Sequence, residues 1–272
     1  GPEKLWGQEL VTWEITAWFL DNLIDQLRFT HDKYRINQIS GVTVDLPQFL
    51  TDTHVIIDKR SAIRYLSRLE EFSRVLDEVR VRVIEDAAHG VVPPDFIVDK
   101  TLSGLKTFTS DGAQINPLVT TFKGKLSELT SMTAAEKKKL GDAAVSIVKN
   151  EILPEYELII DLFNGFAKSA NSSAGIWRIP NGKEIYNLRL QDSTTTDMDA
   201  DSIHQLGLTE VLRINLEMEQ VLASLGYKEG NVAERVKILM ETGDQQFPNT
   251  KEGRREMISY LESLDDALMA QA

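Results

Sequence analysis

The chain of 272 residues is long enough for one large or two small domains with an ample apolar core. Hydrophobic residues make up 42% of it and charged residues 26%, which is typical of a globular protein and not of a disordered one. The formal net charge of -12 argues against a nucleic-acid surface and against a polybasic membrane patch, because both require clustered lysines and arginines.

The sequence contains no cysteine, which excludes disulfides, thiolate zinc sites and cysteine nucleophiles from this chain. No apolar run approaches the roughly 20 residues that a membrane-spanning helix needs. The leading Gly1-Pro2 resembles the scar of a cleaved tag, so the native chain is expected to begin differently, and a removed export signal remains open.

Most of the chain carries the apolar periodicity of amphipathic helices, beginning with residues 9–29, which we expect to form a core helix. Its apolar stripe consists of Leu10, Trp13, Ala17, Leu20, Ile24 and Leu27. Residues 31–59 break this pattern and predict an extended or irregular loop, with Asn37-Gln38 and His54 as its polar candidates. A single loop histidine is more often a hydrogen-bonding or surface residue than a ligand.

Capping residues and prolines predict where the next helices begin and end. Expected starts are Ser61, Pro94, Asn116 and Thr133, the last as a capping box with Glu136. The helix from Ser61 should end before Gly90, and Pro154 should kink the helix that follows Thr133.

Asn171-Ser172-Ser173 is the most linker-like stretch, and it predicts a boundary between a helical region 1–170 and a region 171–272. Both regions are expected to pack as one continuous domain. Asn181-Gly182 lies between two apolar-rich runs and predicts a β-hairpin at about 176–190. The expected fold is therefore mainly α, a multi-helix array with one small hairpin.

Asp199 is a predicted N-cap, and the helix after it should end at Gly226. Its apolar stripe, expected to be buried, consists of Ile203, Leu206, Val211, Ile214, Met218, Val221 and Leu225. Two further helices are predicted, over 232–241 and from about 251 onward.

No complete catalytic or metal-binding motif is present. The four histidines include no pair at i, i+4, so the usual one-helix zinc scaffold is missing. Asp197, Asp199 and Asp201 imitate the start of a calcium loop, but Ser202 stands where that loop needs glycine. Nucleophile elbows and glycine-rich phosphate loops are likewise missing.

Candidate cleft residues come from two neighbouring stretches. Thr194, Thr195 and Thr196 could line a substrate cleft, although hydroxyl groups before a helix more often satisfy local backbone groups. The other candidates for lining or supporting a cleft are Tyr186, His204, Glu210 and Arg213. Arg213 lies three and four residues from acids, so surface ion pairing is the alternative interpretation.

Several motifs together resemble a large bacterial family of unknown function, DUF885, many of whose members are described as secreted lipoproteins. The motifs are GIWRIPNGKEIY (175–186), TTT (194–196), IHQLGLTEVLRINLEM (203–218), YRINQ (34–38), HGVVPPDF (89–96), NPL (116–118) and LPEY (153–156). The similarity spans nearly the whole chain, and residues 194–218 are its most specific part.

The resemblance implies zinc-peptidase relatives whose His-Glu-x-x-Pro-Gly-His-His helix belongs to a C-terminal half that this chain lacks. The chain would then hold no metal ligand or cofactor of its own, with zinc expected in that missing half. It would form scaffold and one wall of the substrate cleft, toward which the candidate residues would face. Expected partners are the C-terminal half and a peptide substrate, with no nucleic acid and no membrane-spanning segment.

By the same resemblance, the native protein would be periplasmic or extracellular and lipid-anchored, although composition alone also allows a cytoplasmic location. The alternative is a non-enzymatic helical binding or interaction module of a secreted or lipid-anchored bacterial protein.

Overall fold

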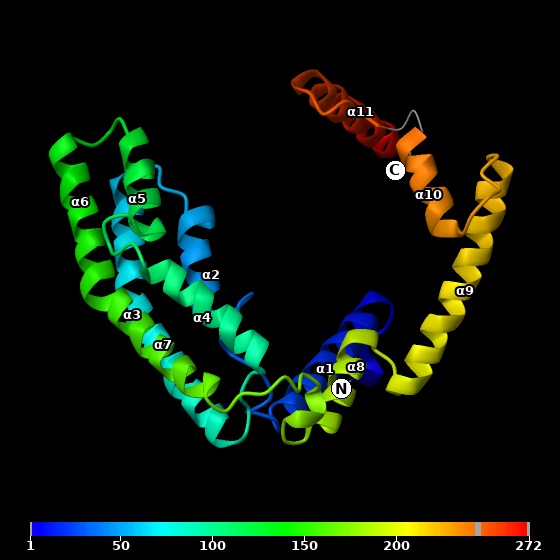
Figure 1. The fold of residues 1–272 in the computed structure, drawn as a ribbon, viewed down its shortest axis with the longest axis horizontal. Helices are drawn as coiled ribbons and strands as arrows, with labels where there is room; N and C mark the ends of the chain where they lie inside the picture. Colours follow the sequence, from blue (N-terminus) through cyan, green and yellow to red (C-terminus); the bar gives the residue numbers. More distant parts are fainter. Residues whose placement is uncertain (1, 243–245, 271–272) are drawn as a thin grey trace. The chain divides into compact units, whose positions relative to one another are not determined.

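The computed structural model describes residues 2–242 and 246–270, and within these ranges the secondary structure is entirely helical. The chain divides into two compact units, Gly1–Thr196 and Asp197–Ala272 (Figure 1). The mainly α prediction is therefore confirmed, whereas the predicted hairpin is wrong. The boundary predicted near residue 170 stays a prediction.

The helices of the first unit include two π-helical turns, η2 and η3. In chain order they are η1 (Pro2–Lys4), α1 (Gln8–Gln26), α2 (Val42–Gln48), η2 (Phe49–Thr53), α3 (Lys59–Ala88), α4 (Asp95–Thr109), α5 (Pro117–Glu128), α6 (Ala134–Ile147), η3 (Val148–Ile152), α7 (Leu153–Ala167), η4 (Ile176–Arg178) and α8 (Gly182–Thr194). The second unit contains α9 (Ala200–Ser224), α10 (Val232–Thr242) and α11 (Lys251–Met269).

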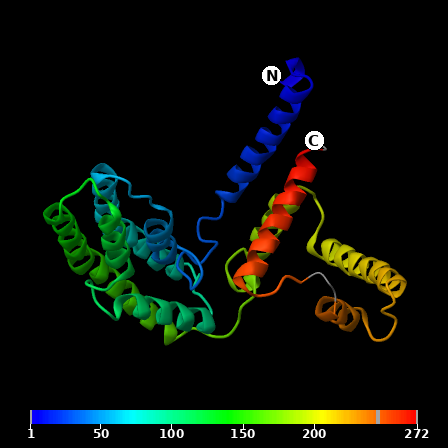
Figure 2. The same cartoon turned by 90° about the horizontal axis from the view of Figure 1, so that it is seen from above.

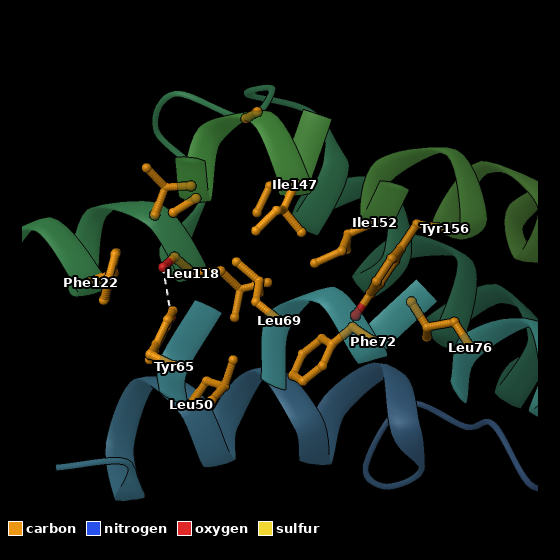
Figure 3. Packing of buried hydrophobic residues seen from close by; sticks show 14 of the residues in the cluster. Leu50, Tyr65, Leu69, Phe72, Leu76, Leu118, Phe122, Ile147, Ile152 and Tyr156 are labelled. Atoms are coloured by element: carbon orange, nitrogen blue, oxygen red, sulfur yellow. Dashed lines mark hydrogen bonds between the residues drawn. The ribbon is translucent and has the colours of Figure 1, made fainter. Parts of the chain in front are cut away.

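The core of the first unit forms around α3, whose inner face packs against α6 and α7 (Figures 1 and 3). That face consists of Ala62, Tyr65, Leu66, Leu69, Phe72, Leu76 and Val83. Tyr65 stacks on Phe122 with ring centroids 4.4 Å apart, and its hydroxyl donates to Leu118 O at 2.7 Å (Figure 3). The buried hydroxyl is thus satisfied, as the cost of desolvation requires.

The loop predicted over 31–59 is wrong in its second half, where α2 and η2 form. Pro47 lies inside α2 and has no N–H for Thr43 O, the acceptor four residues earlier. The buried Tyr156 hydroxyl donates to Thr43 O at 2.8 Å instead. A partner from α7 therefore compensates for the proline and allows a helix where the local sequence disfavours one.

A lysine satisfies the carbonyl groups at the end of η2. Lys125 Nζ of α5 donates to Thr51 O at 2.7 Å and His54 O at 2.8 Å, and lies 3.4 Å from Leu50 O. An ammonium group is favourable at the negative end of a helix. This contact fixes the α2–η2 segment on the bundle.

Most predicted caps are confirmed. Asn116 accepts from Leu118 N at the start of α5, Thr133 and Glu136 form the capping box of α6, and Asp199 caps α9. The predicted cap at Ser61 is shifted by one turn, because Asp58 is the N-cap of α3 and Ser61 completes its capping box.

The hairpin prediction fails because Asn181-Gly182 begins a helix and does not close a two-stranded turn. Asn181 adopts a left-handed conformation with φ 57°. A Cβ on Gly182 would lie 2.0 Å from Ile176 O, so only glycine fits where η4 and α8 meet. Asn181-Gly182 therefore forms a tight turn at the start of α8.

Two predicted core stripes are exposed. Helix α1 has no buried residue, and α9 buries only Leu222. Val211, for example, is 56% exposed. Apolar periodicity indicates a face that needs a neighbour, and within the described part of the chain these two faces largely lack one. None of the described helices combines the length and apolarity needed to span a membrane.

Candidate functional site

Three of the motifs, at residues 34–38, 89–96 and 175–186, meet in the first unit. The first motif contributes Tyr34, the second Val91, and the third Ile176, Ile179 and Ile185. They pack together with Phe29 in a small apolar cluster separate from the main core. The fold therefore brings residues 34–38, 89–96 and 175–186 to one place.

The second segment is positioned by the end of α3. Gly90 has φ 84° and donates to Ala87 O at 3.0 Å, while Val91 donates to Asp86 O at 2.9 Å. These are the two hydrogen bonds of a Schellman motif, which needs glycine at this left-handed position. The Schellman motif turns the chain sharply at Gly90 and places Val91 in the small apolar cluster.

A buried carboxylate lies at the base of this site. Asp86 is only 2% exposed, and its oxygens lie 2.6 Å from both His31 Nδ1 and Arg35 Nε. Arg35 Nη2 also donates to Thr30 O at 2.7 Å. An ionised carboxylate only accepts, so His31 Nδ1 carries the donated proton.

The histidines at the two ends of this arrangement stack. The rings of His31 and His89 have centroids 4.0 Å apart and an interplanar angle of 8°. His89 Nδ1 lies 2.8 Å from Glu85 O, a carbonyl that can only accept. His31 is therefore held to the end of α3 by both Asp86 and His89, whereas Arg35 is held there by Asp86.

The loop after Arg35 is folded tightly by its own groups. Asn37 Oδ1 accepts from Ile39 N at 2.9 Å and Ser40 N at 3.0 Å. A Cβ on Gly41, which has φ 103°, would lie 2.3 Å from Arg35 O. The loop is therefore fixed by backbone contacts as well as by Asp86.

A cavity of about 500 Å³ lies between this loop and the third motif segment. It is lined by Asp32, Lys33, Tyr34, Asn37, Gln38, Ile39, Ser40, Ile97, Ala174, Ile176, Ile179 and Arg189. Arg189 of α8 donates to both Asp32 O and Asp32 Oδ2 at 2.9 Å, which ties α8 to the loop. Gln38 Oε1 is buried and has no hydrogen-bond partner among the described residues.

A second, more apolar cavity of about 780 Å³ shares Ile176 and Arg189 with the first. Trp177 and the predicted candidate Tyr186 line it, and Trp177 is 78% exposed. A Cβ on Gly175 would lie about 2 Å from the Trp177 ring, 2.0 Å at the nearest atom. The glycine therefore lets the indole lie over the backbone.

The three predicted threonines lie at the C-terminal end of α8: Thr194 is its last residue, Thr195 is the C-cap and Thr196 follows. Thr194 Oγ1 donates to Leu190 O at 2.7 Å and lies 3.0 Å from Thr196 Oγ1. Thr195 has φ 54° and donates its N–H to Gln191 O at 2.8 Å. These bonds match the local interpretation, and a cleft role for the threonines stays a prediction.

The other predicted residues lie on α9 in the second unit. Arg213 donates to Glu210 Oε2 and to Glu217 Oε1, each at 2.7 Å. The hydrogen bond from Arg213 lowers the pKa of Glu210. His204 is exposed on the same helix. The structure thus brings Glu210 and Arg213 together as a surface pair, and their role in a cleft stays a prediction.

Residues 2–242 and 246–270 contain no group of three or more histidine, aspartate or glutamate side chains that could hold a metal ion. The zinc implied by the resemblance therefore has no ligand set within these ranges. The loop candidate His54 is buried between Ser61 O and Arg68, away from the residues that line the two cavities.

Comparisons with known proteins agree with the motif resemblance. The family model described as "Bacterial protein of unknown function (DUF885)" matches residues 2–272. A similar solved structure is described as "The crystal structure of the putative lipoprotein from Colwellia psychrerythraea", with a TM-score of 0.79 and 27% identity. The similarity covers 88% of this chain and 41% of that one, so this chain spans less than half the length of that protein. No curated protein matches. The chain belongs to the DUF885 family of bacterial proteins of unknown function.

Proposed function

We propose that this chain is the N-terminal helical portion of a longer hydrolase and supplies the scaffold and one wall of its substrate cleft. The cavity beside the cluster in which the three motif segments meet carries this proposal, because its loop is clamped by Asp86 and its lining residue Gln38 has a buried acceptor, Oε1, without a partner among the described residues. A preorganised polar cavity with apolar walls is the usual form of a ligand site.

The lining of the cavity favours a ligand that carries both an N–H group and a negative charge. Gln38 Oε1 can only accept a hydrogen bond, and Lys33 at the same cavity would attract a carboxylate. A peptide with a free carboxyl end has both groups. The family resemblance adds the finer proposal of a zinc-dependent peptidase, with its metal in the part that this chain does not cover.

Peptide binding tests the cavity directly. We expect trialanine to shift amide resonances of residues 32–40 in ¹H–¹⁵N spectra, and its C-terminal amide to bind more weakly. Gln38→Met removes the acceptor at similar side-chain length and should weaken binding about fivefold, the effect of one hydrogen bond. Gln48→Met is the matched control, because Gln48 is exposed on α2. Equal affinity of both variants would contradict the proposed role of Gln38.

Measurements of zinc content and peptide hydrolysis test whether this chain is a catalytically incomplete portion of the enzyme. The purified 272-residue chain should contain no stoichiometric zinc by mass spectrometry and should not hydrolyse trialanine. If the chain alone bound one zinc per molecule and cleaved the peptide, it could not be the incomplete portion of the enzyme.

The alternative function is a non-enzymatic interaction module of a secreted or lipid-anchored protein. The exposed apolar faces of α1 and α9 favour it. Reading the gene beyond Ala272 discriminates between the two: a following His-Glu-x-x-Pro-Gly-His-His segment would count against the alternative, and a stop codon would support it.

A further inference from the structure

Helix α9 is apolar over more of its circumference than one neighbour can cover. Each residue of an α-helix advances by about 100° around the axis. On this basis the apolar side chains of α9 other than Leu206 extend over about 220°, from Ile203 and Val221 through Leu222 to Leu212 and Leu216. An arc of about 100° is sufficient for a helix that packs on a single core. The sequence of α9 therefore fits a helix with neighbours on two or more sides.

Within the described part of the second unit, α9 has one such neighbour. It packs on α10, where Leu222 is buried and Arg235 Nη2 lies 3.4 Å from Glu219 Oε1 (Figure 2). Leu212 is 66% exposed, and Leu216 and Val211 are also exposed. An apolar strip of this length on one helix marks an interaction surface.

The charges of α9 argue against a lipid surface as the occupant. Arg213 is its one basic residue and is already paired with two acids, Glu210 and Glu217. Helices that bind membrane surfaces are typically rich in lysine and arginine on their polar face. An apolar protein surface is the better fit.

The similar solved protein indicates where that surface comes from. It matches 88% of this chain yet has well over half of its own length outside the match. We propose that the apolar strip of α9 is the docking surface for an apolar helical face in the part of the longer family protein that this chain does not cover. The inference rests on the proposed function and names the contact through which the two parts would join.

Single-cysteine labelling tests this inference, because the chain has no cysteine of its own. Leu212→Cys places a thiol on the strip, and Gln220→Cys places one on the polar side of the same helix as the matched control. Both variants are made in the 272-residue chain and in the complete product of its gene. Maleimide labelling is then followed by mass spectrometry, with melting temperatures checked for each variant.

We expect both thiols to react at similar rates in the 272-residue chain. In the complete gene product, labelling at position 212 should slow at least 100-fold, while position 220 should stay fast. Equal rates at position 212 in both proteins, or a gene product no longer than 272 residues, would overturn the inference.

Slow labelling at position 212 in the short chain would also overturn it, since the strip would then be covered already. Light scattering would show whether a second copy or the same chain covers it. The labelling result is independent of zinc content and hydrolysis, so a failure of docking is distinguishable from a failure of the proposed activity.

Discussion

Asp86 Oδ2 accepts a hydrogen bond from Arg35 Nε at 2.6 Å, between residues 51 positions apart in the chain. The same carboxylate lies 2.6 Å from His31 Nδ1. Residues 32–34, which line the cavity, are therefore held at both ends by one buried group. The position of the cavity wall depends in part on this charge in α3, besides the backbone contacts of the loop and the bonds from Arg189 to Asp32.

Asp86→Asn should lower the free energy of unfolding by about 3 kcal/mol, because it leaves Arg35 partly buried without its counter-ion. Urea unfolding followed by circular dichroism measures the change. Glu78→Gln on the same helix is the control, since Glu78 pairs with Arg74 at the surface and should cost no more than about 0.5 kcal/mol. Equal losses for the two variants would show that Asp86 is not a clamp.

Gly182→Ala should destabilise the first unit, because its Cβ would collide with Ile176 O at 2.0 Å and force η4 and α8 apart. We expect a loss above about 2 kcal/mol, in the range of other severe backbone effects. Gly207→Ala is the matched control within α9, where a new Cβ meets nothing within 4 Å. It should stabilise its helix by about 0.5–1 kcal/mol. Thermal melts of the two variants should shift in opposite directions.

Tyr156→Phe should lower the free energy of unfolding by about 1–3 kcal/mol. Pro47 has no N–H to donate to Thr43 O, and the variant would also remove the Tyr156 hydroxyl that donates to it instead. Tyr260→Phe on the exposed face of α11 should leave the urea midpoint unchanged. If Tyr156→Phe were equally neutral, water or another group would have to satisfy Thr43 O.

Stability should fall as the pH falls below 6.5, through the titration of His54. Burial lowers the pKa of His54 from 6.5, and Arg68 adds to the effect. The unfolded chain then binds more protons than the folded chain between the lowered pKa and 6.5, so this contribution is complete above 6.5 and is lost as pH falls through that window.

Urea midpoints at pH 7.5 and 5.5 measure this effect in the wild type and in His54→Gln. The wild type should lose more stability than the variant over this interval. His204→Gln is the control, since His204 is exposed, and it should keep the wild-type pH response. A pH response of His54→Gln equal to that of the wild type would contradict the assignment.

Helix boundaries could be predicted from the sequence because their signals are local. Asn116, Thr133 and Asp199 bond to backbone groups two or three residues away, and such bonds depend little on the rest of the fold. The hairpin could not be excluded in this way. Asn181-Gly182 allows a two-residue turn and a helix entry alike, and only the close approach of Ile176 O decides between them.

The buried part of the candidate site was not predictable from one sequence. Asp86 resembles any other acid on a helix surface, and its partners lie 51 and 55 residues away. The available signal was indirect. The motif at residues 34–38 contains Arg35 and lies close to His31, and the motif at residues 89–96 follows the end of α3. The stripe on α9 was recognised, but periodicity indicates that a face is to be covered and not which segment covers it.

The π-helical turn η3 has a consequence for how the bundle tolerates changes in length. A π turn accommodates one residue more than an α turn, so α7 is rotated by about 100° relative to a continuous extension of α6. The buried faces of α6 and α7 are thus out of phase by one residue. Deleting Lys149 would let this turn close as an α turn and would leave the Tyr156 hydroxyl facing Thr43. One residue can therefore be removed at η3 without changing which side of α7 meets the core, whereas the same deletion inside α6 would rotate the following residues by about 100°.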